Sequence, residues 1–514
     1  MKPVLLPFAI VAAVFAQAQP GIQWQRSLGG SSYDEAYAMS PCSYGGYALA
    51  GRTRSSNGDV NGIQGQDDFW VVRLDTAGNI LWQRPLGGSA NDGAVEIQQT
   101  ADAGFVVVGW TYSNSGQVSG NHGNADAWVV KLDNGGVIQW QKTFGGSAED
   151  AAYSVEQTSD GGYIVAGYAY STNGTVNGNH GGADAWVLKL DASGTLQWQK
   201  PFGGSLVDKA YSVKQTSDGG YIFAGYSNST DGDVDGNHGD YDFWVLKMDA
   251  TGNFEWQKTM GGTNEEYAYS IQQTTDGGYI IGGWSVSNSG DVTGNHANGD
   301  YWVVKLDAAA NITWQRALGG NMVDKAYAVR ETADGGFVVA GSSNSTDGDI
   351  TNNHGMDDYW IVKLDGSGAL VWERSYGGSN TDVAWPVQST ADGGYLVAGW
   401  SNSINGDVSG NHGDKDIWVV KLAPDVTGIG EHAGLGNLSL FPNPTTGRVT
   451  LQLDQPHSHS DIRITDLSGR LVKTIPVDNM RNPSFQMDVA NGVYFVQVQA
   501  GNGKSGMAKV VVYK

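Results

Sequence analysis

Short runs of alternating hydrophobic and polar residues recur along most of the chain. In one copy, "AYSVEQT" (152–158) and "YIVAGY" (163–168) are rich in β-branched and aromatic residues and flank the turn "SDGG". Further on, "AWVLKLD" (185–191) and "TLQWQK" (195–200) flank a second turn, "ASG". Runs of this kind, bounded by Gly, Asp and Ser, predict two β-hairpins. We therefore expect four antiparallel strands in this copy.

Two tryptophan series show that this unit repeats every 58 residues, in seven copies without insertion or deletion. The first series is Trp24, Trp82, Trp140, Trp198, Trp256, Trp314 and Trp372, and the second is Trp70, Trp128, Trp186, Trp244, Trp302, Trp360 and Trp418. Four strands per copy are typical of a propeller blade and not of a solenoid coil. We expect both series to pack between blades.

The two ends of the repeat region predict a closed ring. The stretch "GIQWQR" (21–26) is a fourth strand without its blade, and the seventh copy stops after its third strand, "IWVVKL" (417–422). The N-terminal strand can therefore complete the last blade, which removes exposed sheet edges. The predicted fold is all-β, with a seven-bladed β-propeller over residues 21–423. Both long loops of each copy fall on one rim, where we expect any ligand to bind.

After a linker at 424–436 the repeat ends, and residues 437–514 predict a small Ig-like β-sandwich. Four motifs follow in order: "LSLFPNPTTGRVTLQL" (438–453), "IRITDLSGRLVKTI" (462–475), "NGVYFVQVQ" (491–499) and "AKVVVYK" (508–514). They resemble the type A C-terminal sorting domain of type IX secretion cargo. The resemblance implies contact with the type IX secretion machinery, passage through the outer membrane, and a product that is anchored at the cell surface or released.

The repeats also resemble the "DGGY-aliphatic-aliphatic-AG…DxWVVKLD…W" propeller repeats common in such cargo. Some of those proteins carry an endoglucanase-like label, but no residue pattern here transfers that activity.

The first residues, "MKPVLLPFAIVAAVFAQAQP", predict a signal peptide over 1–18 with cleavage after Ala18. Its apolar run is too short to span a bilayer, and no later segment approaches the roughly 20 residues required. The net charge of −23 excludes nucleic-acid binding. The single cysteine, Cys42, stands where other copies have Thr, which favours an incidental substitution over a nucleophile. We expect a monomer.

One rim loop, "DGDVDGNHGDYD" (231–242), resembles a calcium-binding loop. Its candidate ligands are Asp231, Asp233, Asp235, the carbonyl of Asn237, and Asp242, so calcium is the candidate cofactor. The alternative is a structural role. The twelfth loop position is Asp in all seven copies, while other copies lack the early carboxylates, as at Ser115, Gln117 and Ser119. Asp side chains accept backbone N–H bonds in such loops. Both interpretations stay open for 231–242.

Three further rings of side chains are expected at the long-loop rim. The acids after each GG turn should approach the central channel, and the histidines of the "NH" pairs favour hydrogen bonding over metal binding. Aromatic residues that end the second strand are candidate ligand-binding residues, because their flat faces can stack on sugars. They are Trp110, Tyr168, Tyr226, Trp284 and Trp400. Wedging between blades is the alternative role for these aromatics.

No catalytic motif is present: the chain lacks G-x-S-x-G, H-E-x-x-H and a phosphate-binding loop. Near-identical blades also offer little asymmetry to separate the pKa values of two catalytic carboxylates. The sequence therefore favours a secreted, surface-displayed binding protein for an extracellular glycan or surface component, with no catalytic residues. A polysaccharide-acting hydrolase and a purely structural surface protein are the alternatives.

Overall fold

The computed structural model describes residues 20–424, 439–443, 445–452, 460–465, 471–477, 482–499 and 505–512. These residues form strands, turns and loops, and no helix occurs among them. The chain divides into a unit at Gln19–Pro424 and another that holds Asp425–Lys514. The predicted signal peptide (1–18), its cleavage site at Ala18 and nearly all of the linker (424–436) lie outside the described residues.

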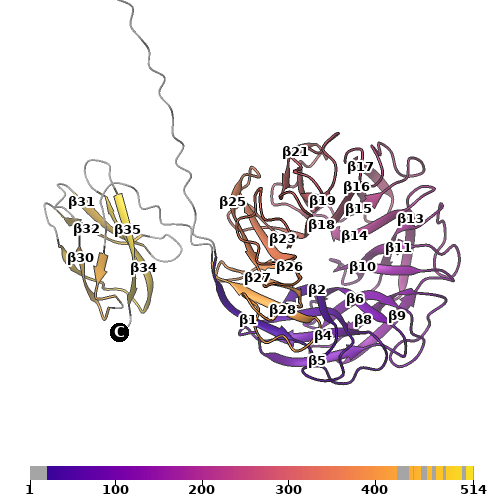
Figure 1. Ribbon diagram of the computed structural model, residues 1–514, viewed down its shortest axis with the longest axis horizontal. Helices are drawn as coiled ribbons and strands as arrows, with labels where there is room; N and C mark the ends of the chain where they lie inside the picture. Colours follow the sequence, from indigo (N-terminus) through magenta and orange to yellow (C-terminus); the bar gives the residue numbers. More distant parts are fainter. Residues whose placement is uncertain are drawn as a thin grey trace, which may run out of the picture. The chain divides into compact units, whose positions relative to one another are not determined.

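The first unit consists of seven four-stranded antiparallel sheets, which Figure 1 shows arranged around one axis. Blades 1 to 4 are β2 (Asp34–Pro41), β3 (Tyr47–Thr53), β4 (Asp68–Leu74) and β5 (Ile80–Leu86); β6 (Asp92–Gln99), β7 (Phe105–Thr111), β8 (Asp126–Leu132) and β9 (Ile138–Phe144); β10 (Asp150–Gln157), β11 (Tyr163–Ala169), β12 (Asp184–Leu190) and β13 (Leu196–Phe202); β14 (Asp208–Gln215), β15 (Tyr221–Ser227), β16 (Asp242–Met248) and β17 (Phe254–Met260). Blades 5 to 7 are β18 (Glu266–Gln273), β19 (Tyr279–Ser285), β20 (Asp300–Leu306) and β21 (Ile312–Leu318); β22 (Asp324–Glu331), β23 (Phe337–Ser343), β24 (Asp358–Leu364) and β25 (Leu370–Tyr376); β26 (Asp382–Ser389), β27 (Tyr395–Ser401), β28 (Asp416–Leu422) and β1 (Ile22–Leu28). The predicted four strands per repeat are confirmed.

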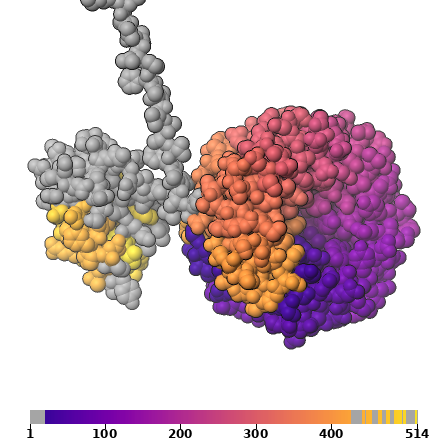
Figure 2. All heavy atoms as spheres, viewed as in Figure 1, coloured from indigo at the N-terminus to yellow at the C-terminus, as the bar shows by residue number. Residues whose placement is uncertain are grey.

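The N-terminal strand completes the last blade. Strand β1 pairs antiparallel with β28, and the partner of Leu28 is Ile417. The innermost strand of each blade contacts that of the next blade, including β26 and β2 across the junction of the last blade and the first. In Figure 2 the indigo first residues accordingly lie beside the orange last blade. The pairing leaves β28 without a free edge.

The two tryptophan series have different roles between the blades. The second series forms the core, since members such as Trp128 and Trp244 are fully buried. The first series packs on the neighbouring blade: the ring centroid of Trp140 lies 5.7 Å from that of Tyr163 in the next sheet. Each blade thus buries apolar surface against the next, and this burial stabilises the ring.

A buried cation closes most of the short turns on the rim opposite the long loops, here called the short-turn rim. Lys189 Nζ lies 2.9 Å from Asp160 Oδ2, and the same pair recurs in five other blades. In the first blade Tyr44 replaces the Asp, and Arg73 donates instead to the carbonyl of Gly45. Cys42 is buried beside this turn, and burial raises the pKa of its thiol to about 11. A protonated, buried thiol fits the incidental-substitution interpretation.

The second unit contains two sheets that share one apolar core. Their strands are β29 (Ser439–Phe441), β30 (Arg448–Gln452) and β33 (Ser484–Gln486) in one sheet, and β31 (Ser460–Thr465), β32 (Leu471–Val477), β34 (Gly492–Gln499) and β35 (Ser505–Val512) in the other. Leu451 and Phe485 from the first sheet cluster with Ile464, Val496 and Val510 from the second. This arrangement is a small β-sandwich, as predicted. Among the residues described, no helix is long and apolar enough to cross a membrane.

Candidate functional site

A β-bulge in the innermost strand of each blade places one extra residue at the central channel. In β10, Ala152 pairs with Gly167 and Ser154 pairs with Ala166, so Tyr153 is the extra residue. A Cβ on Gly167 would lie 2.0 Å from the carbonyl oxygen of Ala151, so a larger residue does not fit opposite the bulge. Bulges redirect side chains in this way. The equivalent residues are Tyr37, Val95, Tyr153, Tyr211, Tyr269, Tyr327 and Trp385, the last followed by the unpaired Pro386.

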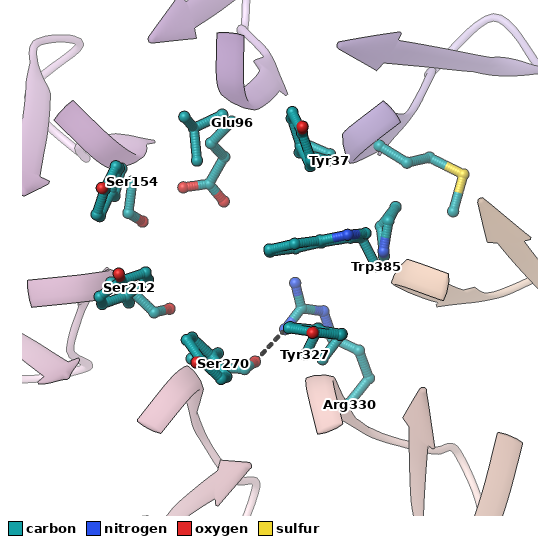
Figure 3. Close-up of a pocket in the computed structure, with 16 residues that line it drawn as sticks. Tyr37, Glu96, Ser154, Ser212, Ser270, Tyr327, Arg330 and Trp385 are labelled. Atoms are coloured by element: carbon teal, nitrogen blue, oxygen red, sulfur yellow. Dashed lines mark hydrogen bonds between the residues drawn. The ribbon is translucent and has the colours of Figure 1, made fainter. Parts of the chain in front are cut away.

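Six of these seven residues are aromatic and form a continuous arc around the channel (Figure 3). The centroid distances between neighbours are 4.6 Å for Tyr153–Tyr211, 5.2 Å for Tyr211–Tyr269, 5.3 Å for Tyr269–Tyr327, 4.2 Å for Tyr327–Trp385 and 5.1 Å for Trp385–Tyr37. Val95 interrupts the ring. All six rings are half-buried, so each keeps some surface open to the channel. We call this set the aromatic arc.

Four charged side chains, the channel charges, lie in the same channel: Glu96, Glu156, Lys214 and Arg330. Lys214 Nζ lies 3.7 Å from Glu96 Oε1 and 3.9 Å from Glu156 Oε2. Each glutamate also accepts a backbone N–H from the next blade, Glu96 at 2.7 Å and Glu156 at 3.2 Å. These carboxylates therefore satisfy donors on the channel-facing edges of innermost strands.

Arg330 differs from the other three channel charges. Its Nη1 donates to Ser270 Oγ at 3.3 Å and to the carbonyl of Val329 at 3.0 Å. No carboxylate in the described part of the chain forms an ion pair with it. In Figure 3 its guanidinium extends toward the middle of the channel, and Arg330 lines the cavity of the aromatic arc together with Tyr327 and Trp385.

The channel is hollowed in three places that share lining residues. A cavity of about 90 Å³ lies among the aromatic arc, Glu96 and Arg330. Two larger hollows, of about 600 and 340 Å³, are lined by the channel charges and by glutamines. Arg330 lines all three. The larger hollows also include Thr216, Ser217 and Gln99, at the ends of innermost strands nearest the short turns. The two larger hollows have the volume of a small-molecule site and polar walls, while the aromatic residues line only the cavity of about 90 Å³ beside them.

Burial shifts the pKa values of two channel charges. Burial raises the pKa of Glu156, although the nearby Lys214 opposes this shift. Burial lowers the pKa of Arg330, against the attraction of Glu96 and Glu156. The two glutamates nevertheless have similar surroundings, since each accepts a backbone N–H and faces Lys214. An acid and base pair of a glycosidase needs unlike surroundings.

Three of the five aromatic residues predicted to bind ligand lie one layer behind the arc. Tyr168 packs edge-on against Tyr153 at 5.3 Å, and the Tyr226 ring lies 5.5 Å from that of Tyr211. Only 4% of Tyr168 and 9% of Tyr226 is exposed. Trp284 Nε1 donates to the hydroxyl of Tyr269 at 3.2 Å. These three side chains therefore hold arc residues in place from behind.

Lysine amines cover the ring faces of several of these aromatics. Nζ lies 3.7 Å from the ring centroid for Lys209 over Tyr168, 4.5 Å for Lys325 over Trp284, and 3.7 Å for Lys415 over Trp400. Trp110 is half-buried and packs edge-on against Tyr112 at 5.6 Å. This packing favours the wedging role, and sugar binding by Trp110, Tyr168, Tyr226, Trp284 and Trp400 stays a prediction.

The rim loop 231–242 uses its early carboxylates to hold the preceding GG turn. Asp231 Oδ1 accepts the N–H of Ser205 at 2.7 Å, and Asp233 Oδ2 accepts that of Gly203 at 3.2 Å. In the second blade Gln117 Oε1 accepts the equivalent bond from Gly87 at 2.9 Å. A neutral acceptor does the same work, so this position requires an oxygen and not a charge.

Of the remaining candidate ligand atoms, Asp242 Oδ2 accepts hydrogen bonds from the His238 ring and backbone. The backbone carbonyl of Asp235 accepts from Gln257 and Thr259, and the Asn237 side chain bridges Ser227 and Gly239, but these are not the atoms predicted to bind calcium. No group of three or more His, Cys, Asp or Glu side chains suited to a metal occurs within the described residues. The calcium site at Asp231, Asp233, Asp235, Asn237 and Asp242 stays a prediction.

The acids after each GG turn are buried beneath the rim and do not approach the channel as expected. Asp208 is fully buried and accepts hydrogen bonds from the N–H of Gly204 and from the hydroxyls of Ser227 and Ser229. Its neighbour Asp184 lies close by: Oδ1 of Asp184 and Oδ2 of Asp208 both approach the same face of Gly203. Burial raises the pKa of both carboxyls.

The histidines of the "NH" pairs each contact the twelfth-position aspartate. His238 Nδ1 lies 2.7 Å from Asp242 Oδ2, and five other blades repeat this contact. These contacts are hydrogen bonds of the kind expected from the sequence. The second oxygen of each such aspartate is buried and accepts no hydrogen bond within the described structure.

Sequence reasoning missed the channel charges. Three of the four channel charges stand six residues after a GG-turn acid, and Glu96 stands four residues after Asp92. The residues six positions after the acid in the seven copies are Ser40, Gln98, Glu156, Lys214, Gln272, Arg330 and Gln388. Aligning the copies at 58-residue spacing would have revealed this variable position. The dipeptide Trp385-Pro386, which no other copy carries at this position, also lines the channel.

Comparisons with known proteins add little for the propeller. The regulatory protein FlaEY of Caulobacter vibrioides is 29% identical over 164 residues, an alignment that covers 29% of this chain and 17% of that protein. A fungal alcohol oxidase of the AA5 family in complex with copper has a TM-score of 0.41 at 13% identity, covering 96% of this chain and 100% of that one. A puromycin hydrolase has a TM-score of 0.42 at 12% identity, covering 86% of this chain and 62% of that one. Such low scores support no inference about function.

The second unit gives a definite assignment. Residues 439–513 match the model of the secretion system C-terminal sorting domain, in agreement with the four sequence motifs. A domain of this kind directs cargo to the type IX secretion machinery and to the cell surface or the extracellular space. This chain is therefore a type IX secretion cargo protein that carries a β-propeller.

Proposed function

We propose that the propeller binds an extracellular glycan or other surface component in its central channel. The observation that carries the proposal is the aromatic arc beside the channel charges, because flat apolar faces next to polar groups suit a sugar. The hollows of about 600 and 340 Å³ leave room for a ligand. The expected location therefore moves from the long-loop rim to the channel.

A screen of purified propeller on a glycan array, followed by calorimetry on the hits, tests this proposal. Two variants use residues that other blades already carry at the same position: Tyr211→Val, as at Val95, and Trp400→Ser, as at Ser342. Loss of an arc face should weaken binding about tenfold, or about 1.4 kcal/mol, in Tyr211→Val. Trp400→Ser should bind like the wild type. Unchanged binding in Tyr211→Val together with weaker binding in Trp400→Ser would indicate a ligand site at the long-loop rim instead.

The same sugars should be assayed for new reducing ends. Hydrolysis lost in Glu96→Gln or Glu156→Gln would replace the binding proposal with the hydrolase alternative. No binding and no hydrolysis of any sugar would favour a structural surface protein.

A further inference from the structure

Of the two channel cations, Arg330 forms no ion pair with any carboxylate among the residues that the structure describes. Lys214 faces two glutamates, both of which also accept backbone N–H groups. Arg330 has only the Ser270 hydroxyl and the Val329 carbonyl, both bound by the same nitrogen, Nη1. Its planar guanidinium presents further N–H donors in a fixed fork.

This guanidinium lies where a ligand would contact it. It lines all three hollows of the channel and extends toward Trp385 and the aromatic arc (Figure 3). The Arg330 side chain is half-buried, and burial lowers its pKa. A partly desolvated charge without a carboxylate partner gains from an anion that forms hydrogen bonds to it.

The nearby carboxylates do not satisfy this requirement. Glu96 and Glu156 attract Arg330 electrostatically but form no ion pair with it, and both are engaged by Lys214 and by backbone N–H groups. Gln272 and Gln388 line the hollow of about 600 Å³ together with Arg330, and their amide groups can bind hydroxyl groups.

We infer that the channel selects a carboxylate-bearing ligand, such as a uronic acid unit of an acidic glycan, with Arg330 as the group that binds the carboxylate. A carboxylate matches the guanidinium fork with two parallel N–H···O bonds. The aromatic arc would hold the sugar ring beside it. This inference rests on the proposed binding function and names the ligand class for the same site.

Calorimetry with two probes tests the inference: free glucuronate against glucose, and a uronic-acid oligosaccharide against its neutral counterpart. We expect the acidic probe to bind at least about tenfold more tightly to the wild type, the factor that one charge-assisted contact supplies. Arg330→Gln should remove this preference, so that the variant binds the acidic and the neutral probe with similar affinity. The blades already carry Gln at this position three times, at Gln98, Gln272 and Gln388, so the variant should fold.

Two further variants test whether the preference for acidic probes comes from the planar donor geometry of the guanidinium or from its positive charge alone. Arg330→Lys keeps the charge without the fork and should lose most of the preference. Lys142→Gln removes an exposed charge from the outermost strand β9 and should change nothing. Equal binding of acidic and neutral probes, or a preference that survives Arg330→Gln, would overturn the inference.

The outcomes keep the two proposals apart. Neutral sugars that bind as well as acidic ones would leave glycan binding intact and refute only the carboxylate preference. Arg330-dependent binding of glucuronate without any binding of neutral sugars or oligosaccharides would support the anion site and refute the general glycan proposal. No binding of any probe would refute both.

Discussion

At the third position of the rim loop, the seven blades carry Asp five times, Gln once and Thr once, and each accepts a bond from the first glycine of the preceding GG turn. Six residues after the GG-turn acid, the same blades carry Ser, Gln, Glu, Lys or Arg. At the rim position the residue type varies between blades but the hydrogen bond is the same. At the channel position the residue type and its contacts both vary.

This difference separates structure from function. A contact repeated by different side chains is a requirement of the blade geometry. Side chains that differ in charge from blade to blade, and that gather around one cavity, meet no such requirement. We therefore expect the ligand to bind in the channel, and we assign the rim loops a structural role in connecting blades.

The largest effect should follow from removal of the strand that completes the last blade. Deletion of residues 20–28 exposes the edge of β28 and removes the carbonyl of Pro20 that accepts from the Tyr376 hydroxyl at 2.5 Å. We expect the melting temperature to fall by about 5–10 °C, or the propeller to associate edge to edge. Calorimetry and size-exclusion chromatography measure these effects. An unchanged melting temperature in a monomer would contradict the fastening role of β1.

A pair of substitutions sharpens the comparison of rim and channel. Asp208→Ala leaves the N–H of Gly204 and two buried hydroxyls without an acceptor, so we expect a loss of about 2 kcal/mol in unfolding free energy. Lys214→Gln introduces the residue of three other blades into the channel and removes two partly exposed ion pairs, with Glu96 and Glu156, so it should cost no more than about 1 kcal/mol. Chemical denaturation measures both. Equal costs would show that the channel is also structural.

The GG-turn acids at the long-loop rim and the aspartates of the short turns should contribute to folding stability with opposite pH dependence. Burial raises the pKa of Asp34 and Asp324 to about 6, against 3.8 for an ordinary Asp. Their contribution to stability is present below pH 3.8 and is lost as the pH rises through 6. For Asp160 burial is outweighed by hydrogen bonds from Thr158 and Lys189, which lower its pKa to about 2. Its contribution is lost as the pH falls from 3.8 to 2.

Thermal melting across pH therefore distinguishes the two rims. We expect the propeller to melt at a higher temperature at pH 5 than at pH 7.5, and the gain to reverse below pH 3.8. A melting temperature that rises steadily from pH 5 to pH 7.5 would show that the buried carboxylates of the long-loop rim do not determine the pH dependence of stability.

The smallest effect concerns calcium at the 231–242 loop. Since Asp231 and Asp233 already accept backbone N–H bonds, we expect no difference in melting temperature between saturating calcium and a chelator. Asp233→Gln, which copies Gln117 of the second blade, should melt like the wild type. A rise in melting temperature with calcium that disappears in Asp233→Gln would establish the predicted site, because a ligand that binds only the folded state stabilises it.

The prediction succeeded where the evidence is local or periodic. Hairpin turns such as "SDGG" and alternating strands lie within one copy, and the 58-residue spacing of the tryptophans shows how often the copy recurs, so the sequence predicted the blades and their number. The incomplete first and last copies predicted the pairing of β1 with β28. The sorting domain was predicted from contiguous motifs.

The site could not be predicted in the same way. Glu96, Glu156, Lys214 and Arg330 come from four different blades and meet only once the ring has closed. Tyr153 faces the channel because a bulge shifts the register of β10 by one residue, which simple alternation does not encode. The sequence by itself determined what each blade is. The tertiary structure alone decided which side chains share a cavity, because that depends on contacts between residues far apart in the chain.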